Sequence, residues 1–237
     1  MDIRLQSNTG NGARRFQRVP RKPAPCLRCI QTEADLHEGI RALRRKCKVM
    51  RQVHDVVGLP PMRLREPGFE GLARIIVGQQ VSVASADAIW SRFALAIQPM
   101  SVERLRLISD DALRAAGMSR PKIRTFRAIA EASSLDFARL TAIADDEVHT
   151  ALTSISGIGP WTADVYLLFC LGRADAFAAG DLALQVAAQH AFGLERRPAP
   201  MELLGLAESW RPWRGVAARL LWTYYRSVKA TKSGLPV

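Results

Sequence analysis

A single aspartate stands where the sequence predicts that a helix begins. Asp181 follows Gly180 and precedes the apolar run from Leu182 to Phe192, which is a good N-cap signature. The N–H groups at the start of that helix would favour the ionised carboxylate at neutral pH. An ionised carboxylate is also the species that could stabilise an oxocarbenium-like sugar cation. The pattern alone favours a structural cap, and a catalytic role is compatible with that cap.

A glycine-rich turn separates two helical patterns upstream of this aspartate. The turn has the sequence Gly157-Ile-Gly-Pro160. Glycine permits a tight turn with bare backbone facing outward, and proline suits the first position of a helix. The second helix would therefore present free N–H groups, and phosphate is the ligand that best suits them. A turn that merely ends the first helix fits this short pattern about as well.

Two tryptophans could bind a flat, positively charged group. Trp161 directly follows the glycine-rich turn, and Trp222 lies in the last helical stretch. The face of an indole attracts a cation that lies over it. An isolated tryptophan is more often a core residue, so the residue types alone favour burial.

The elements that must position these side chains are predicted to be helices. From Thr32 onward the apolar spacing is helical almost everywhere, and no convincing period-two strand is found. Breaks at Pro60-Pro61, Pro67-Gly68 and Pro99 divide the pattern into about ten short helices, including one from Ser82 to Ala96. The sequence therefore predicts an all-α fold, with two helical lobes and a cleft between them.

The basic charge is concentrated at the start of the chain. The net charge is +12, of which residues 1–51 contribute +9. Residues 1–30 mix Gly, Asn, Pro and Arg, so we expect a disordered or loosely attached leader, followed by a helical domain over 31–230 and a tail over 231–237. A basic arm suits a polyanion such as nucleic acid, although basic tails also occur on proteins with other partners.

Several protein classes are excluded by composition. No stretch approaches the roughly 18 consecutive apolar residues of a membrane span, and the polar N-terminus does not resemble a signal peptide. We therefore expect a cytoplasmic protein without membrane association. Cys26-x-x-Cys29 has no second cysteine or histidine pair to complete a zinc site, so its thiols are expected to be reduced.

Several separated motifs occur in an order typical of one enzyme superfamily. They are Ile75-Ile-Val-Gly-Gln-Gln-Val-Ser-Val83, Gly157-Ile-Gly-Pro-Trp-Thr-Ala163, Asp175-Ala-Phe-Ala-Ala-Gly-Asp-Leu182 and Trp210-Arg-Pro-Trp-Arg-Gly-Val-Ala-Ala-Arg219. Together they resemble the helix-hairpin-helix (HhH-GPD) DNA glycosylases, and within them the DNA-3-methyladenine glycosylase II branch. The resemblance extends from about Leu36 to Val228. The β-rich N-terminal domain of longer members is expected to be absent.

The resemblance implies base-excision repair of alkylated purines in double-stranded DNA. The enzyme would flip the damaged nucleotide and hydrolyse its N-glycosidic bond, with Asp181 as the catalytic carboxylate, and would leave an abasic site. Relatives that also cut the DNA backbone carry a lysine at the position of Trp161, so lyase activity is not expected. A monomer is expected.

The resemblance also assigns the remaining site residues. Trp161, Trp222 and Tyr166 would form the base pocket, although the tyrosine of relatives aligns with Val165, one residue before Tyr166. Gln79 and Gln80 would face the minor groove, with Gln80 filling the gap left by the flipped base. The hairpin would bind DNA through Gly157, Ile158, Gly159 and Thr162.

Cofactors are expected to be few. Hairpins of this superfamily often hold a monovalent cation, K⁺ or Na⁺, which would bind the carbonyls of Ile155 and Gly157 here. No metal is expected as a catalyst. The iron–sulfur relatives need four cysteines near the C-terminus, whereas no cysteine follows Cys170.

Two alternatives remain open at the level of sequence. The enzyme could act on another damaged base, such as a deaminated or oxidised one, or the chain could be a non-catalytic DNA-binding module. Such a module needs the hairpin but has no use for Asp181. An Asp181 carboxylate that opens into the same cavity as Trp161 and Trp222 would indicate an enzyme.

Overall fold

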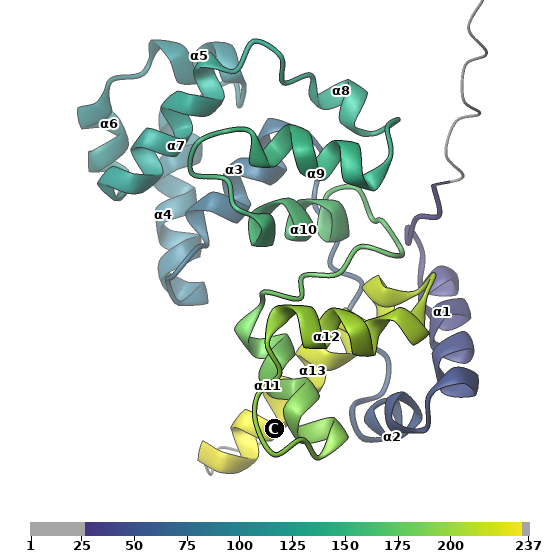
Figure 1. The fold of residues 1–237 in the computed structure, drawn as a ribbon. Coiled ribbons are helices and arrows are strands. Elements are labelled where there is room, and N and C mark those ends of the chain that lie inside the picture. Colours follow the sequence, from purple (N-terminus) through teal and green to yellow (C-terminus); the bar gives the residue numbers. More distant parts are fainter. Residues whose placement is uncertain (1–26, 234–237) are drawn as a thin grey trace, which may run out of the picture.

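The computed structural model describes residues 27–233, with side chains described up to residue 229. This part of the chain contains thirteen α-helices, one 3₁₀ helix and no strand, which confirms the predicted all-α fold (Figure 1). An isolated bridge between Cys29 and Arg173 is the sole β-type pairing in the described range. Residues 1–26, with Cys26 and most of the predicted leader, lie outside it, as do residues 234–237.

The first lobe is continuous in sequence and occupies the upper half of Figure 1. Its helices begin at residues whose side chains satisfy exposed N–H groups: Ser82, Ser101, Ser109 and Asp136 each accept a hydrogen bond from the first turn. The lobe consists of α3 (Phe69–Val77), α4 (Val83–Ala96), α5 (Val102–Leu107), α6 (Asp110–Ala115), α7 (Arg120–Glu131), α8 (Phe137–Leu140), α9 (Asp145–Thr153) and α10 (Pro160–Phe169).

The second lobe combines the two ends of the described chain. Helices α1 and α2 pack against α13, which also packs against α11. Thr32 starts α1 with a capping box, in which the Asp35 carboxylate accepts the Thr32 N–H at 2.8 Å. The lobe consists of α1 (Glu33–Lys46), α2 (Lys48–Val57), α11 (Leu182–Phe192), α12 (Pro200–Ala207), the 3₁₀ helix η1 (Glu208–Trp210) and α13 (Arg214–Ser233).

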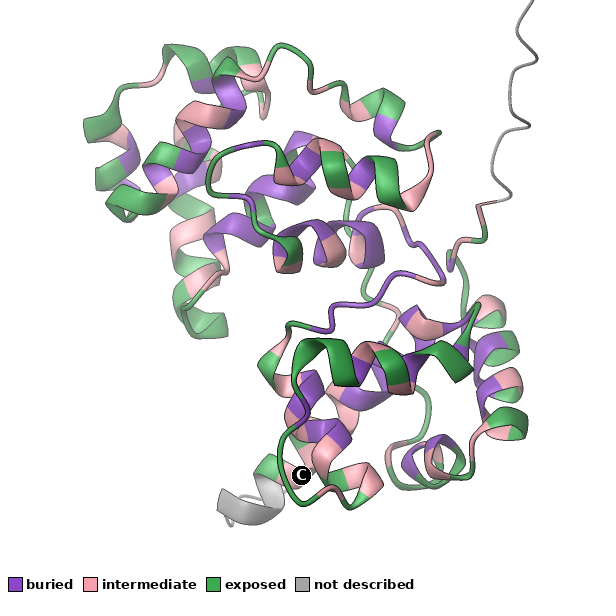
Figure 2. Cartoon of the chain, viewed as in Figure 1, coloured by how far each residue is buried: buried purple, intermediate pink, exposed green. Residues whose placement is uncertain are grey.

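The core is formed by apolar faces of the helices, in agreement with the helical spacing of apolar residues in the sequence. Leu36, Ile40 and Leu43 on α1 are buried, as are Leu72 and Ile76 on α3. Most helices in Figure 2 show buried residues on the side that faces their neighbours and exposed residues on the outer side, whereas α4 (Val83–Ala96) is largely exposed or half-buried. No described helix has both the length and the apolar character needed to cross a membrane.

Two segments join the lobes, and one of them corrects the predicted leader boundary. Residues 58–68 lead from α2 to α3, and residues 170–181 lead from α10 to α11. Ile30 is completely buried, and its N–H donates to the carbonyl of Gly172 at 2.6 Å. The prediction of a loose leader up to residue 30 is therefore wrong at its end, because this apolar side chain packs into the core.

Candidate active site

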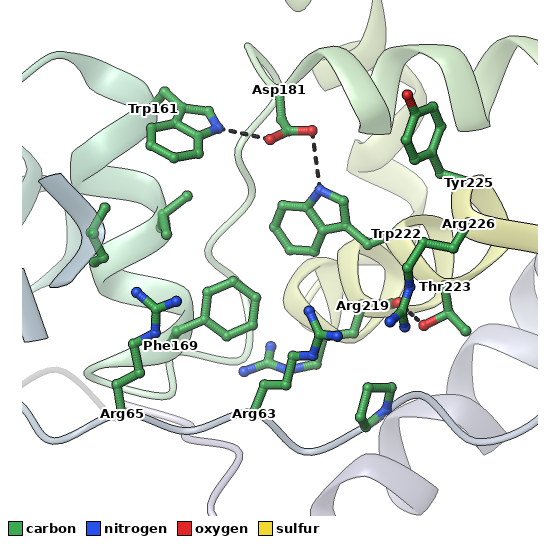
Figure 3. A pocket seen from close by; sticks show the side chains of 13 residues that line it. Arg63, Arg65, Trp161, Phe169, Asp181, Arg219, Trp222, Thr223, Tyr225 and Arg226 are labelled. Carbon is green, nitrogen blue, oxygen red and sulfur yellow. Dashed lines mark hydrogen bonds between the residues drawn. The ribbon is translucent and has the colours of Figure 1, made fainter. Parts of the chain in front are cut away.

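A cavity of about 270 Å³ lies where the two lobes meet. Helices α3 and α10 contribute residues from the first lobe, and α13 and the start of α11 contribute residues from the second. Figure 3 shows their side chains converging from both lobes. The lining residues are Pro61, Arg63, Arg65, Ile75, Trp161, Val165, Phe169, Asp181, Arg219, Trp222, Thr223, Tyr225 and Arg226.

Asp181 sits at the N-cap of α11, and its carboxylate accepts three hydrogen bonds. Oδ1 accepts the N–H of Leu184 at 3.1 Å and Nε1–H of Trp222 at 3.0 Å. Oδ2 accepts Nε1–H of Trp161 at 2.7 Å. A carboxylate has about four acceptor positions, so one remains for a reacting group in the cavity. Asp181 thus combines the cap and the cavity-facing carboxylate that the sequence left as compatible roles.

The two tryptophans form walls of the cavity on either side of this carboxylate (Figure 3). Both are half-buried, and both point their indole N–H at Asp181. The ring of Phe169 lies 5.4 Å from that of Trp222, centroid to centroid. Asp181, Trp161 and Trp222 therefore share one cavity, which is the arrangement expected of an enzyme rather than of a simple binding module.

Tyr166 does not belong to the base pocket, and its predicted place there is wrong. Its side chain is fully buried, and its hydroxyl accepts the N–H of Gly68 at 2.9 Å. Burial raises its pKa. Val165, one residue earlier, lines the cavity instead. The reason is helical geometry: a one-residue step turns a side chain by about 100° around α10.

Four arginines of the cavity were not predicted from the sequence. Arg63 and Arg65 come from the segment between α2 and α3, and Arg219 and Arg226 come from α13. Arg219 is the last residue of one of the motifs that resemble the superfamily, but neither its type nor its spacing indicated that its side chain faces the cavity. The other three stand in no motif, so only the fold brings them together.

The hairpin between α9 and α10 depends on Gly157. Its φ is +87°, in the region that favours glycine, and a Cβ there would lie 1.9 Å from Oγ1 of Thr125. Gly157 and Gly159 are exposed. In the described part of the chain, no hydrogen bond uses the N–H of Gly157, Gly159 or Trp161. These groups are available to an anion at the start of α10.

Two of the residues predicted to bind DNA at the hairpin have buried side chains. Ile158 is buried, and its N–H donates to the carbonyl of Ile155 at 3.0 Å. Thr162 is also buried, its N–H donates to the carbonyl of Gly159, and its hydroxyl accepts an amide N–H of Gln79 at 2.8 Å. Both residues stabilise the hairpin from inside because the helical turn directs them into the core.

The two glutamines at the end of α3 have different surroundings. Gln79 is half-buried and joins this turn to α10 through Thr162. Gln80 is exposed and has a φ of +55°, which is uncommon for a residue other than glycine. Nζ of Lys122 donates to the carbonyls of Val77 at 2.8 Å and Gln79 at 3.0 Å, and so holds the turn. Lys122 was not predicted from the sequence.

The turn and the hairpin border one polar groove of about 320 Å³. Gln80 and Gly157 both line it, together with Lys122 and Arg124 from the start of α7. The structure therefore brings predicted DNA-binding residues from two distant segments to the same surface and adds two cationic side chains to them.

Two other aspartates in this region have different surroundings. Asp175 accepts hydrogen bonds from Arg214 at 3.0 Å and also pairs with Arg211, so it is a structural ion-pair partner. Asp164 lies on α10 with 20% of its side chain exposed, and burial raises its pKa to about 7 against the opposing attraction of Arg214. Neither lines the cavity.

The described residues contain no cluster of three or more His, Cys, Asp or Glu side chains that could hold a metal ion. The predicted hairpin cation would use backbone oxygens instead. The Ile155 carbonyl already accepts the Ile158 N–H, which leaves one lone pair free.

Known proteins resemble this chain in both sequence and structure. The family model described as HhH-GPD superfamily base excision DNA repair protein matches residues 73–212. DNA-3-methyladenine glycosylase 1 of Schizosaccharomyces pombe is 33% identical over 182 residues, covering 74% of this chain and 79% of that protein. A putative DNA-3-methyladenine glycosylase of Bacillus subtilis is 30% identical over 174 residues, covering 68% of this chain and 60% of that protein.

Solved structures show the same likeness. The Schizosaccharomyces pombe 3-methyladenine DNA glycosylase in complex with abasic DNA superposes with a TM-score of 0.69 at 29% identity, covering 78% of this chain and 95% of that one. A DNA-3-methyladenine glycosidase from Bacillus halodurans superposes with a TM-score of 0.70 at 29% identity, covering 84% and 91% of the two chains.

Proposed function

Because this chain belongs to the HhH-GPD superfamily of base excision DNA repair proteins, we propose that it is a monofunctional DNA glycosylase acting on alkylated purines. The enzyme flips the damaged nucleotide out of duplex DNA, hydrolyses the N-glycosidic bond and leaves an abasic site. The names of its relatives, several of which are DNA-3-methyladenine glycosylases, support this substrate class.

The observation that carries the proposal is the Asp181 carboxylate between two indoles in one cavity. As the N-glycosidic bond breaks, positive charge develops on the sugar. A fixed carboxylate beside that charge stabilises the transition state more than the ground state. The one acceptor position of Asp181 that is not hydrogen-bonded is available to the sugar or to the attacking water.

The residues that line the cavity are suited to hydrolysis and not to the lyase reaction. A glycosylase that also cuts the backbone attacks the sugar with an amine, which forms a Schiff base. The lining residues in the described part of the chain include no lysine, and Trp161 occupies the hairpin position nearest to Asp181. Water is therefore the nucleophile in our proposal.

DNA is held outside the cavity by the hairpin and the turn after α3. The unused N–H groups of Gly157 and Gly159 bind a backbone phosphate at the positive end of α10. The exposed Gln80 enters the base stack beside the flipped nucleotide. A K⁺ or Na⁺ ion would bind the carbonyls of Ile155 and Gly157, because carbonyl oxygens suit such ions. We propose a monomer as the active form, which agrees with a site whose named residues all come from one chain.

The test is single-turnover release of 3-methyladenine and 7-methylguanine from methylated duplex DNA at saturating enzyme. We expect Asp181→Asn to lower the rate by about 100-fold or more, the size of effect found when an oriented electrostatic group is removed. Affinity for duplex DNA should remain. Asp146→Asn, at an exposed position of α9, is the matched control and should release bases at the native rate.

If the native protein binds duplex DNA but releases neither base, the alkylpurine assignment fails. If native protein and Asp181→Asn release bases equally fast, the role of Asp181 fails.

A further inference from the structure

The end of the cavity away from Asp181 is lined by four guanidinium groups (Figure 3). We call Arg63, Arg65, Arg219 and Arg226 the arginine cluster. Asp181 is the one acidic residue among the described lining residues. None of the four arginines forms an ion pair with a described carboxylate. The cavity therefore has one negative end and a strongly positive opposite end.

Arg219 is buried, whereas Arg63, Arg65 and Arg226 remain exposed to solvent. Partial burial lowers the pKa of Arg63, and repulsion by Arg226 lowers it further. Partial burial likewise lowers the pKa of Arg65, with repulsion by Arg74 and Arg63 adding to the effect. The pKa of Arg219 falls to about 10 through burial, which still leaves it protonated at neutral pH. Cations in such surroundings are stabilised by a ligand that brings oxygen acceptors.

Arg219 is held rigidly in the cavity wall. Its side chain is 3% exposed, and its two Nη atoms donate to the carbonyls of Gly215 at 3.0 Å and Leu168 at 2.7 Å. Its Nε–H is buried and has no hydrogen-bond partner among the described residues. The guanidinium also lies over the ring of Phe169, 5.0 Å from its centroid, so Arg219 contributes fixed charge to the cavity wall.

The segment that carries Arg63 and Arg65 is held in place. The N–H of Arg65 donates to the carbonyl of Phe169 at 2.8 Å, and the N–H of Gly68 donates to the hydroxyl of Tyr166 at 2.9 Å. Arg63 has a φ of +38°, in the left-handed region that non-glycine residues rarely adopt. Such backbone strain persists where the surrounding structure enforces it and is concentrated at functional sites.

We infer that the arginine cluster is a specificity subsite for the carbonyl oxygen of a damaged purine, in the glycosylase reaction proposed above. A purine with its sugar at Asp181 directs its far edge toward the opposite end of the cavity. In hypoxanthine a guanidinium group pairs with O6 and N7 in a fork, whereas in 7-methylguanine the methylated N7 cannot accept and O6 alone is available. Hypoxanthine and 7-methylguanine carry that oxygen. 3-Methyladenine and 1,N6-ethenoadenine lack it.

The experiment compares four lesions in single-turnover release from duplex DNA. Hypoxanthine and 7-methylguanine carry the 6-oxo group, whereas 3-methyladenine and 1,N6-ethenoadenine do not. We expect Arg63→Gln/Arg65→Gln to slow release of hypoxanthine by about 10-fold or more, as for loss of one bidentate base contact. Release of 7-methylguanine should slow by less, because O6 is its one acceptor for the fork. Release of ethenoadenine and of 3-methyladenine should be unchanged. Arg226→Gln is a second, independent variant with the same expected direction.

Two further variants separate a base carbonyl from a DNA phosphate as the acceptor. Arg63→Lys/Arg65→Lys keeps the charge but loses the planar fork, so it should remain defective toward 6-oxo bases. Arg41→Gln/Arg45→Gln removes two exposed arginines of α1 outside the cavity and controls for net charge. An equal loss of release for all four lesions, with a reduced salt dependence of DNA affinity and rescue by lysine, would assign the cluster to a phosphate and overturn the inference.

A binding measurement separates this inference from the proposed function. Free hypoxanthine and free 3-methyladenine are titrated into the native protein and Arg63→Gln/Arg65→Gln, with tryptophan fluorescence as the readout because Trp161 and Trp222 line the cavity. The inference is supported if the native protein binds hypoxanthine more tightly than 3-methyladenine and the variant loses this preference, even if no base is released from DNA. Equal affinity of both proteins for hypoxanthine would contradict the inference even if the enzyme is active.

Discussion

Nε1 of Trp161 donates a 2.7 Å hydrogen bond to Oδ2 of Asp181, although the rest of α10 and residues 170–180 separate the two residues in the chain. The bond orients the indole and occupies one side of the carboxylate. Leu184 and Trp222 occupy the other oxygen. The carboxylate is therefore both the proposed catalytic group and the acceptor that fixes two walls of the cavity.

This dual role predicts that Asp181→Asn lowers the free energy of unfolding, independently of its effect on catalysis. A carboxamide has one oxygen, so its NH₂ must face at least one of the three N–H donors. We expect a loss of about 1–3 kcal/mol in the free energy of unfolding, as for a buried donor left unpaired. In a Trp161→Phe background the loss should be smaller, because the donor is gone. Urea unfolding of the double-mutant cycle measures the difference. Trp90→Phe is the control background, and equal losses in all backgrounds would contradict the prediction.

Tyr166→Phe tests the anchor of the segment that carries Arg63 and Arg65. The variant removes the acceptor of the Gly68 N–H and should lower the free energy of unfolding by about 1–3 kcal/mol. Thermal unfolding measures this loss. Tyr224→Phe is the matched control, since the hydroxyl of Tyr224 forms no hydrogen bond within the described residues. An unchanged Tm in Tyr166→Phe would show that the contact does not hold the segment.

The raised pKa of Asp164 predicts that the stability of the folded protein depends on pH. Burial raises its pKa to about 7 in the folded protein, above the value of 3.8 for a free side chain. Between these values the folded state binds more protons than the unfolded state, so this carboxyl lowers stability as the pH rises from about 4 to about 7. The slope is at most about 1.4 kcal/mol per pH unit.

Asp164→Asn should flatten that part of the pH profile, because its side chain does not titrate. Chemical denaturation from pH 5 to pH 8 measures the effect as a difference from the native protein. The exposed Asp146→Asn should keep the native slope. If Asp164→Asn and the native protein have parallel profiles, the carboxyl is ionised throughout this range.

The hairpin offers a matched pair of glycine substitutions. Gly157→Ala places a Cβ 1.9 Å from Thr125 Oγ1 at a φ of +87°, whereas a Cβ at Gly159 meets no atom within 4 Å. We expect Gly157→Ala to reduce the free energy of unfolding by about 1–3 kcal/mol, from backbone strain alone, and to weaken duplex binding. Gly159→Ala should keep native stability. Any loss of its affinity for duplex DNA would then show that the backbone at Gly159 lies close to the DNA. Equal stability of the two variants would contradict the role of Gly157.

The sequence alone determined the helical elements and the residues with a local signature. The faces of α1 and α3, the capping box at Thr32, the N-cap at Asp181 and the glycine turn at Gly157 all depend on near neighbours in the chain. Helix periodicity and capping are local properties, so their patterns are visible in one dimension. The resemblance to the family likewise pointed to Asp181 as the catalytic carboxylate and to Trp161 and Trp222 as base-pocket residues.

Tertiary structure decided which side chains reach the cavity and which are buried. Tyr166 and Val165 differ by one residue, and only the packing of α10 shows that Val165 lines the cavity while Tyr166 anchors residues 58–68. The arginine cluster joins that segment to α13, more than 150 positions later in the chain. No local pattern records such a contact. It arises because the buried faces of α1, α2, α11 and α13 bring both ends of the domain into one lobe.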